Sequence, residues 1–152
     1  MFKKSVCCVF IALAFLIFSH VSYAAEQGVA VSTLYTDTGA DTTHFRTDTI
    51  EWVANTSNPD ASAAVAAVTE LSPATQLGFV RIPAGYRSDW HPAPRKQYVM
   101  VLSGKLEVEA GDGERREFAP GTVLLVTDVD GRGHKTNALG TDDVFLVWVP
   151  VP

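Results

Sequence analysis

Hydrophobic and polar residues alternate along much of the second half of the chain, and this period of two is typical of β-strands that bury one face. In the clearest example, alternation places Gln97, Val99 and Val101 on one face of a strand. Met100 and Leu102 then lie on the opposite face. The segments that we expect to be strands are residues 42–53, 77–82, 97–102, 105–109, 115–118, 122–126 and 144–151. Many short strands separated by turns indicate an all-β sandwich or barrel.

Two parts of the first half lack this pattern. Residues 25–41 form a polar stretch. Residues 55–76 are rich in alanine, and two interpretations stay open for them. Either Asp60 caps a short helix that places Val65 and Val68 on one face, or the segment is a loop lying over the strands.

The N-terminus has the features of a secretory signal peptide. Lys3 and Lys4 form a positive start, residues 9–18 are apolar, and small residues end at Ala24. The apolar run is short for a membrane span, so we expect cleavage near Ala24, export to the periplasm or the medium, and no stable membrane insertion afterwards. The expected divisions are a signal peptide at 1–24, N-terminal strands with the alanine-rich segment at 25–76, and a barrel core at 77–152.

Charge and cysteine usage exclude some functions. The chain has 12 basic and 17 acidic residues, a net charge of −5 that becomes −7 when Lys3 and Lys4 leave with the signal peptide. Binding to nucleic-acid phosphates needs clustered lysine and arginine, so we expect no nucleic-acid partner. Cys7 and Cys8 also lie in the signal peptide, so we expect neither disulfides nor thiol chemistry in the rest of the chain.

Glycines and histidines recur at defined distances in the strand-rich half. Five residues separate Gly85 from His91, and six separate Gln97 from Gly104. A Pro-Gly turn and a later histidine follow, so that the matching positions are Gly85, His91, Gly104, Pro120, Gly121 and His134. This pattern resembles the cupin superfamily and, in detail, small single-domain bacterial cupins with a type 2-like conserved barrel. The resemblance implies one double-stranded β-helix, or jelly-roll barrel, with an N-terminal extension, assembled as a homodimer.

The resemblance also implies a metal site, because the matching residues of cupins converge on one ion. The matching residues here are His91, Gln97 and His134. The chain departs from the pattern twice, since Ala93 stands where a histidine would be and Gln97 stands where a glutamate would be. Alanine has no donor atom, and a neutral amide is a weaker ligand than a carboxylate. One divalent ion (iron, manganese, nickel or zinc) is therefore an alternative to a metal-free barrel.

The same residues suit a site without metal. His91 and His134 are candidate catalytic bases, because imidazole titrates near neutral pH. Arg95 offers planar donors suited to a carboxylate or a phosphate. Asp128 and Asp130 lack the remaining ligands of a calcium loop, and we assign them no role. The candidate ligand-binding residues are Gln97, Arg95, Arg87 and Trp90.

Three functional hypotheses remain, and the sequence leaves open whether the protein is an enzyme. The first is an exported barrel that binds a small polar or anionic molecule. The second is a metal-dependent isomerase, lyase or oxygenase that uses His91, Gln97 and His134. The third is a structural or interaction module whose cavity is filled by valines such as Val99 and Val126.

Overall fold

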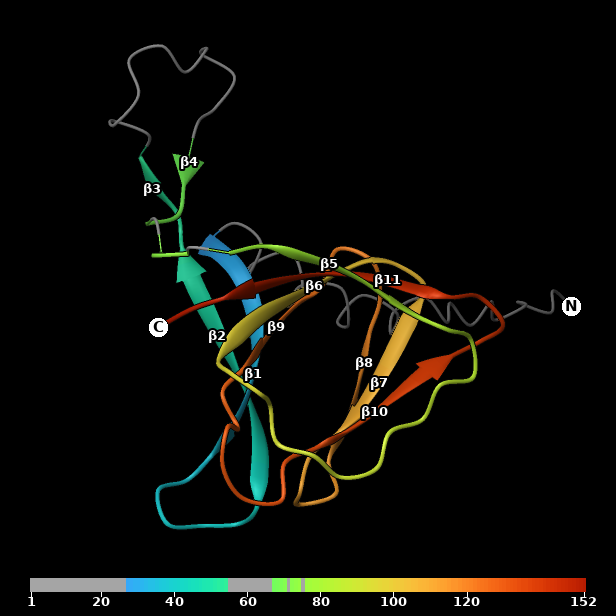
Figure 1. The fold of residues 1–152 in the computed structure, drawn as a ribbon. Helices are drawn as coiled ribbons and strands as arrows, with labels where there is room; N and C mark the ends of the chain where they lie inside the picture. Colours follow the sequence, from blue (N-terminus) through green and yellow to red (C-terminus); the bar gives the residue numbers. More distant parts are fainter. Residues whose placement is uncertain (1–26, 55–66, 71, 75) are drawn as a thin grey trace, which may run out of the picture.

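The protein is built from β-strands (Figure 1). The computed structural model describes residues 27–54, 67–70, 72–74 and 76–152. Their elements are β1 (Gly28–Thr36), β2 (Thr43–Glu51), β3 (Val53–Ala54), β4 (Ala67–Val68), β5 (Gly78–Ile82), β6 (Gln97–Ser103), β7 (Lys105–Glu109), β8 (Arg115–Phe118), β9 (Val123–Val126), β10 (Lys135–Leu139) and β11 (Val144–Pro150). The predicted all-β fold is confirmed, and it is that of a jelly-roll barrel.

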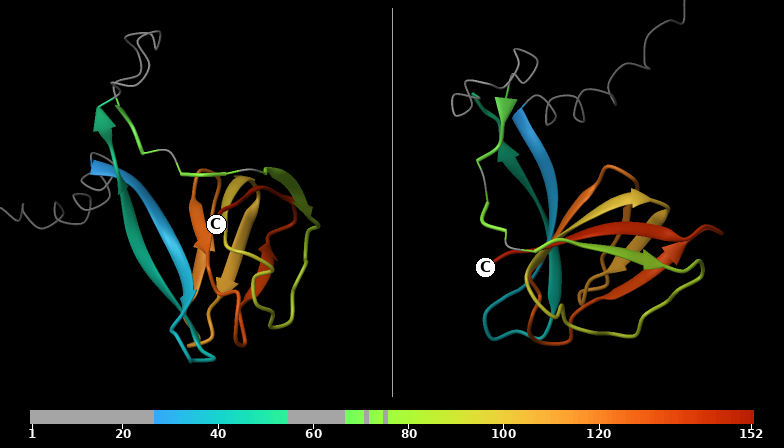
Figure 2. Two further views of the ribbon diagram at one scale, coloured as in Figure 1. Left: turned by 60° about the vertical axis from the view of Figure 1, so that its left-hand side comes forward. Right: turned by 45° about the horizontal axis from the view of Figure 1, so that its top comes forward.

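Two sheets enclose the interior of the barrel. The larger sheet has the order β2-β1-β9-β6-β11-β5, and the smaller one has the order β10-β7-β8. Neighbouring strands are antiparallel except β1 and β9, which run parallel with Thr33 opposite Leu125. In both views of Figure 2 the long β1–β2 hairpin lies at one side of the barrel and extends past it. This hairpin is therefore a continuation of the large sheet rather than a separate unit.

Residues 25–41, which the sequence analysis described only as a polar stretch, contain the strand β1 at Gly28–Thr36. Leu34 belongs to the core, whereas Val31 and Thr33 are buried on the opposite face of the strand, where Thr33 donates a hydrogen bond to Asp48 Oδ2 at 2.7 Å. A strand stabilised by pairing on both sides can carry such polar residues, since its neighbours and not its own pattern determine it. The edge strand β10, which pairs with β7, was also missed, and its buried residues include the polar Asn137.

Two further expectations concern the ends of the N-terminal part. The predicted strand over 42–53 is divided at Trp52 into β2 and the short β3. The choice between helix and loop for 55–76 falls largely outside the described residues. Within the described part of this segment, β4 pairs with β3. The predicted signal peptide at 1–24 also lies outside them. Within the described part of the chain, no helix has the length and apolar character needed to cross a membrane.

The hydrophobic core lies between the two sheets. Leu34, Val99 and Leu146 from the large sheet are buried together with Val108 and Phe118 from the small sheet. Each fully buried side chain of this size stabilises the fold by about 1.5–3 kcal/mol. The alternation predicted for β6 is confirmed, because its inward residues are buried and its outward residues from Met100 onward are exposed.

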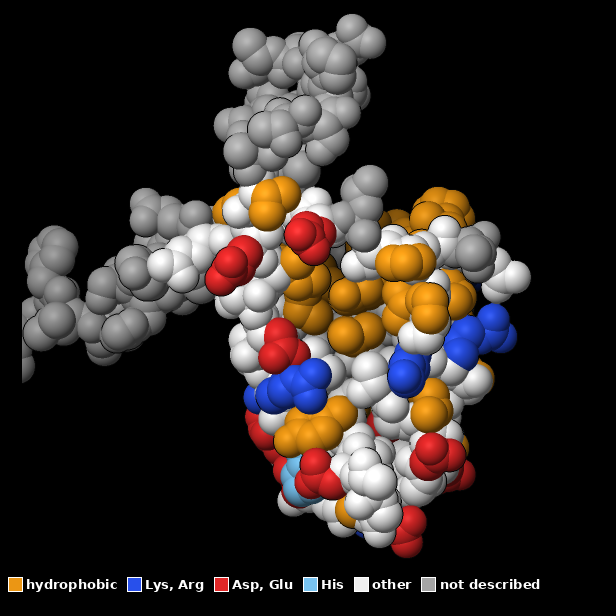
Figure 3. Space-filling model, turned by 90° about the vertical axis from the view of Figure 1, so that its left-hand side faces the viewer, with side chains coloured by type: hydrophobic (Ala, Val, Ile, Leu, Met, Phe, Trp, Pro, Cys, Tyr) orange, Lys and Arg blue, Asp and Glu red, His pale blue; other side chains and the backbone are white. Residues whose placement is uncertain are grey.

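The outer surface keeps several large hydrophobic side chains in contact with solvent. Phe79, Leu102 and Phe145 lie on the adjacent strands β5, β6 and β11, and Phe79 is 77% exposed. Figure 3 shows hydrophobic side chains gathered mainly in the upper half of one face, with most charged side chains below them. The predicted homodimer stays a prediction.

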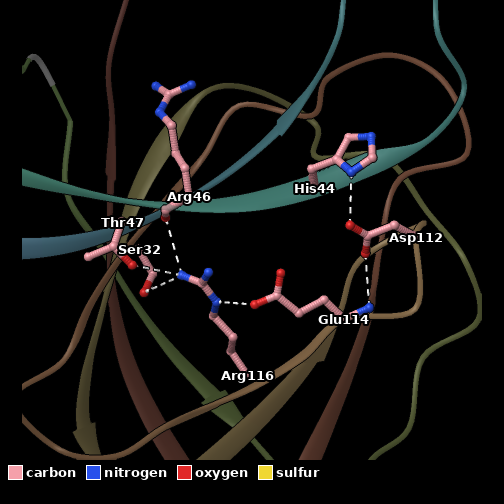
Figure 4. Close-up of polar contacts among 7 residues, drawn as sticks. All are labelled: Ser32, His44, Arg46, Thr47, Asp112, Glu114 and Arg116. Carbon is pink, nitrogen blue, oxygen red and sulfur yellow. Dashed lines mark hydrogen bonds and ion pairs between the residues drawn. The ribbon is translucent and has the colours of Figure 1, made fainter.

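Polar contacts attach the β1–β2 hairpin to the small sheet. Arg116 of β8 donates hydrogen bonds to the backbone oxygen of Arg46 and to Thr47 Oγ1, at 3.2 and 3.0 Å (Figure 4). Nearby, His44 Nδ1 lies 2.8 Å from Asp112 Oδ2 in the turn between β7 and β8. The His44–Asp112 contact lies at the end of the barrel where Thr43, the neighbour of His44, also contacts the loop that carries His134.

Candidate functional site

A cavity of about 290 Å³ lies between the two sheets. Strands β5, β6, β9 and β11 of the large sheet form most of its wall, while Leu106, Val108 and Thr136 contribute from the small sheet. Most lining side chains are apolar, and His91, Gln97 and His134 all reach it. The residues that the motif spacing predicted to lie together therefore share one cavity.

The two histidines are held side by side by the backbone. His91 N–H donates to the carbonyl oxygen of His134, and His134 N–H donates to that of His91, both at 3.0 Å. The two rings are tilted relative to each other, with centroids 4.6 Å apart. The Nδ1 of His91 lies 2.9 Å from the carbonyl oxygen of Asp89, which only accepts, so this nitrogen carries the proton. The Nε2 of His91 is left for contacts in the cavity.

Gly133 makes this pairing possible. Its φ of 77° is a conformation that glycine adopts without strain. A Cβ at this position would overlap the carbonyl oxygen of His91, so no larger residue fits between the two loops. The backbone oxygen of Gly133 also accepts a hydrogen bond from Thr43 Oγ1 at 2.8 Å, which ties the loop to β2.

Asp128 is the residue that the sequence analysis missed. It is fully buried, and its Oδ2 lies 2.7 Å from Nδ1 of His134. Since a carboxylate only accepts hydrogen bonds, it keeps the His134 proton on Nδ1 and leaves Nε2 for the cavity. The carbonyl oxygen of Asp128 also accepts a hydrogen bond from Ala93 N–H at 2.9 Å. Asp128 thus orients one imidazole through its side chain and holds the opposite loop through its backbone.

Gln97, at the start of β6, is a further polar residue of the cavity lining. Only 5% of its surface is exposed, and its side-chain amide makes no hydrogen bond within the described residues. Ala93, at the position of the missing histidine, is buried and adds an apolar patch to the lining. The amide atoms of Gln97 are not among the enclosed polar atoms that lack a partner, so they open to the cavity and are available to a bound molecule.

The structure does not bring the other candidate residues into the cavity. Arg87 is exposed and pairs through its backbone with Asn137. Arg95 is exposed and lines a neighbouring hollow that also reaches Gln97. Trp90 is half-buried and stacks with Arg132, whose guanidinium lies 3.8 Å from the ring centroid, rather than lining the cavity.

The rim of the cavity carries one arginine, and it is already paired. Arg81 Nε donates to Asp143 Oδ2 at 2.6 Å, and Ala84 N–H donates to the other carboxylate oxygen at 2.9 Å. The hydrogen bond from Ala84, followed by that from Arg81, lowers the pKa of Asp143 below its usual value. The positive charge of Arg81 is therefore offset at the rim.

The residues present do not fit a firmly held divalent ion. Among the described residues, no group of three or more histidine, cysteine, aspartate or glutamate side chains could hold one. Two imidazoles face the cavity, but Asp128 lies behind His134, Gln97 offers a neutral amide, and Ala93 has no donor. A divalent ion bound by nitrogen and oxygen ligands needs more donors, and a compensating anion, than this set provides.

Comparison with known proteins agrees with this architecture. Residues 78–150 match the family described as Cupin domain. This part of the chain is therefore similar to cupin domains. The match contains every residue of the cavity site discussed above, whereas β1 to β4 precede it. None of the curated proteins matches the chain.

Solved structures of cupin domains are also similar to this chain. A Cupin 2 conserved barrel domain protein from Salinispora arenicola is 20% identical with a TM-score of 0.38, over 47% of this chain and 60% of that one. A sugar phosphate isomerase of the cupin superfamily from Silicibacter pomeroyi is 23% identical with a TM-score of 0.40, over 50% of each chain. A cupin domain from Bordetella pertussis is 13% identical with a TM-score of 0.41, over 83% of this chain and 96% of that one. This chain thus spans less than two thirds of the length of the first two proteins.

Proposed function

We propose that the cupin domain binds a small organic molecule in the cavity between its sheets. The observation that carries the proposal is the side-chain amide of Gln97, which has no partner within the described residues and opens to an apolar cavity together with two imidazoles. Few converging polar groups in an otherwise apolar hollow are typical of ligand sites. The cavity volume of about 290 Å³ is that of roughly ten water molecules in the liquid, so only a small ligand fits.

The lining favours a ligand with an apolar body and one neutral polar end. Valine and leucine side chains and Trp148 surround the apolar part. Gln97 can both donate and accept, while each neutral imidazole accepts at Nε2. An anionic end, the other class expected from the sequence, finds less support. Arg81 is paired at the rim, and Arg87 and Arg95 lie outside the cavity lining.

The valines expected to fill the interior leave it open. Val99 and Val126 line the cavity without closing it. Val123, which belongs to the same hypothesis, lies on the outward side of β9 and borders a different hollow. A purely structural role for the barrel therefore has less support than ligand binding.

Thermal unfolding of the full chain with benzamide, benzyl alcohol and benzoate tests the proposal. We expect the two neutral compounds to raise the Tm by about 2 °C or more near saturation, and benzoate to have a smaller effect. Val99→Phe narrows the cavity and should abolish the shift, whereas Val123→Phe, on the outer face, should preserve it. Equal shifts in both variants, or none in the wild type, would contradict binding in this cavity.

The metal-dependent alternative is tested by elemental analysis after loading with iron, manganese, nickel or zinc. Because the donor set is incomplete, we expect much less than one ion per chain, and the same value for the double variant His91→Ala, His134→Ala. Stoichiometric metal that disappears in the double variant would instead establish the His91, Gln97 and His134 centre. Export and homodimer formation belong to the same proposal, and cell fractionation and size-exclusion chromatography test them.

A further inference from the structure

The geometry points to His134 as a general base for the molecule bound in the cavity, positioned by Asp128. This inference rests on the proposed ligand-binding function and adds a reaction class to it. His134 is the catalytic residue in this assignment, because it lines the cavity. Asp128 is a positioning residue, because it acts through His134.

The hydrogen bond between the two side chains determines which nitrogen can react. Asp128 Oδ2 lies 2.7 Å from Nδ1 of His134, and the exposed fractions of the two side chains are 0% and 10%. With Nδ1 engaged, Nε2 is the one ring nitrogen of His134 that can take a proton from a ligand. A carboxylate that holds an imidazole in this tautomer also stabilises the imidazolium that forms when it accepts a proton.

A second feature separates this pair from a purely structural contact. Of the buried side-chain polar atoms in the described residues, Asp128 Oδ1 is the one without a hydrogen-bond partner. A buried carboxylate is usually compensated by several donors, and here the side chain has His134 alone. The one side-chain hydrogen bond of Asp128 among the described residues is therefore made to the imidazole, whose orientation it fixes.

Two neighbouring groups complete the site. Gln97 lies in the same cavity and its amide N–H groups are available to an oxygen that gains negative charge. His91, whose ring centroid is 4.6 Å from that of His134, offers a further Nε2 beside the bound molecule. The apolar walls keep water away from the proton being moved.

These groups fit proton transfer at a carbon next to a carbonyl group. The C–H bond breaks, its proton forms an N–H bond at His134 Nε2, and the electron pair moves into the enolate. Gln97 hydrogen-bonds the enolate oxygen. Return of the same proton to the enolate oxygen gives the enol, an isomer of the substrate, so that no oxidant, reductant or co-reactant is needed. The substrate class is a small neutral carbonyl compound with an apolar body.

A chromogenic probe, 5-nitrobenzisoxazole, tests this base in the full chain. Removal of its C–H proton by a base breaks the N–O bond and opens the ring to one coloured product, a phenoxide that carries a nitrile group, so absorbance reports proton abstraction alone. We expect a rate about 100-fold above that of free imidazole at the same concentration. His134→Gln should lose this excess. Asp128→Asn should lower kcat by about tenfold or more with little change in KM.

A second histidine–aspartate pair, His44 and Asp112, supplies matched controls. His44→Gln and Asp112→Asn change a histidine–aspartate contact of 2.8 Å that lies outside the cavity, so both variants should keep the wild-type rate. Melting curves of all four variants establish that they are folded. A 15N NMR spectrum of the imidazoles gives an independent measurement, in which wild-type His134 should show the Nδ1–H tautomer and Asp128→Asn should lose it.

The outcomes separate this inference from the proposed function. Quenching of tryptophan fluorescence by the probe measures its binding, since Trp148 lines the cavity. If the probe binds but the wild type and His134→Gln react with it at the same rate, His134 is not the base, while the proposed ligand binding still holds. An Nε2–H tautomer of His134 also overturns it, whatever the ligand. If neither the probe nor the neutral fragments bind, the proposed function fails and the inference fails with it.

Discussion

Two histidine–aspartate pairs occur in this protein with nearly the same contact geometry and opposite surroundings. His134 and Asp128 are 2.7 Å apart with side-chain exposures of 10% and 0%, while His44 and Asp112 are 2.8 Å apart with exposures of 33% and 30%. The first pair faces a cavity, and the second fastens a hairpin turn to β2. The contact distance therefore says little about role, which depends on what the remaining ring nitrogen can reach.

A glycine with positive φ lies next to each pair, and substituting it should give the largest difference between the two regions. Gly133→Ala places a Cβ against the carbonyl of His91, at a φ of 77°. We expect a loss of about 4 kcal/mol in the free energy of unfolding, because steric overlap with the backbone adds to the left-handed conformation. Urea denaturation measures this loss.

Gly113, beside Asp112, is the matched position. Its φ is 91°, but a Cβ there meets nothing within 4 Å. Gly113→Ala should therefore cost only the conformational strain of about 1 kcal/mol. Equal losses for the two variants would show that the loop carrying His134 shifts easily, and that the backbone pairing with His91 is not rigid.

Removing each aspartate should give a smaller but still unequal effect. Asp128→Ala leaves the buried Nδ1–H of His134 without an acceptor, and we expect a loss of about 3 kcal/mol. Asp112→Ala breaks a partly exposed pair, which should cost less than about 1 kcal/mol. Chemical denaturation at neutral pH compares the two variants with the wild type. Similar losses would mean that burial does not distinguish the pairs.

The sequence predicted the strands with strong alternation and missed those determined by their neighbours. In β6 and β7 most inward positions are aliphatic, so the period of two is visible without a structure. In β1 both faces carry buried residues, with Thr33 on the face opposite Leu34, and parallel pairing with β9 decides the conformation. Such pairing joins residues about ninety positions apart, which a local pattern does not contain.

The candidate site shows the same division. Motif spacing identified His91, Gln97 and His134, because a jelly-roll fold brings these positions to one interior. It gave no role to Asp128, whose link to His134 depends on the loop folding back at Gly133. The sequence also does not give the direction of a side chain. Arg95 was expected to contact the ligand, but it lines only the neighbouring hollow.

The smallest effect that we expect concerns the surface pair, where the free energy of unfolding should change with pH as Asp112 titrates. Burial raises the pKa of Asp112, but hydrogen bonds from Glu114 N–H and from His44, together with the charge of His44, hold it below the usual value. A carboxyl with a depressed folded pKa contributes stability that is present above its unfolded pKa of about 4 and is lost as the pH falls through the folded pKa. Asp112→Asn lacks this titration. The wild type should therefore lose slightly more stability than the variant between about pH 4 and pH 2, by less than about 1 kcal/mol. Urea denaturation across this range measures the difference, and parallel curves would show that the His44 contact adds nothing to the fold.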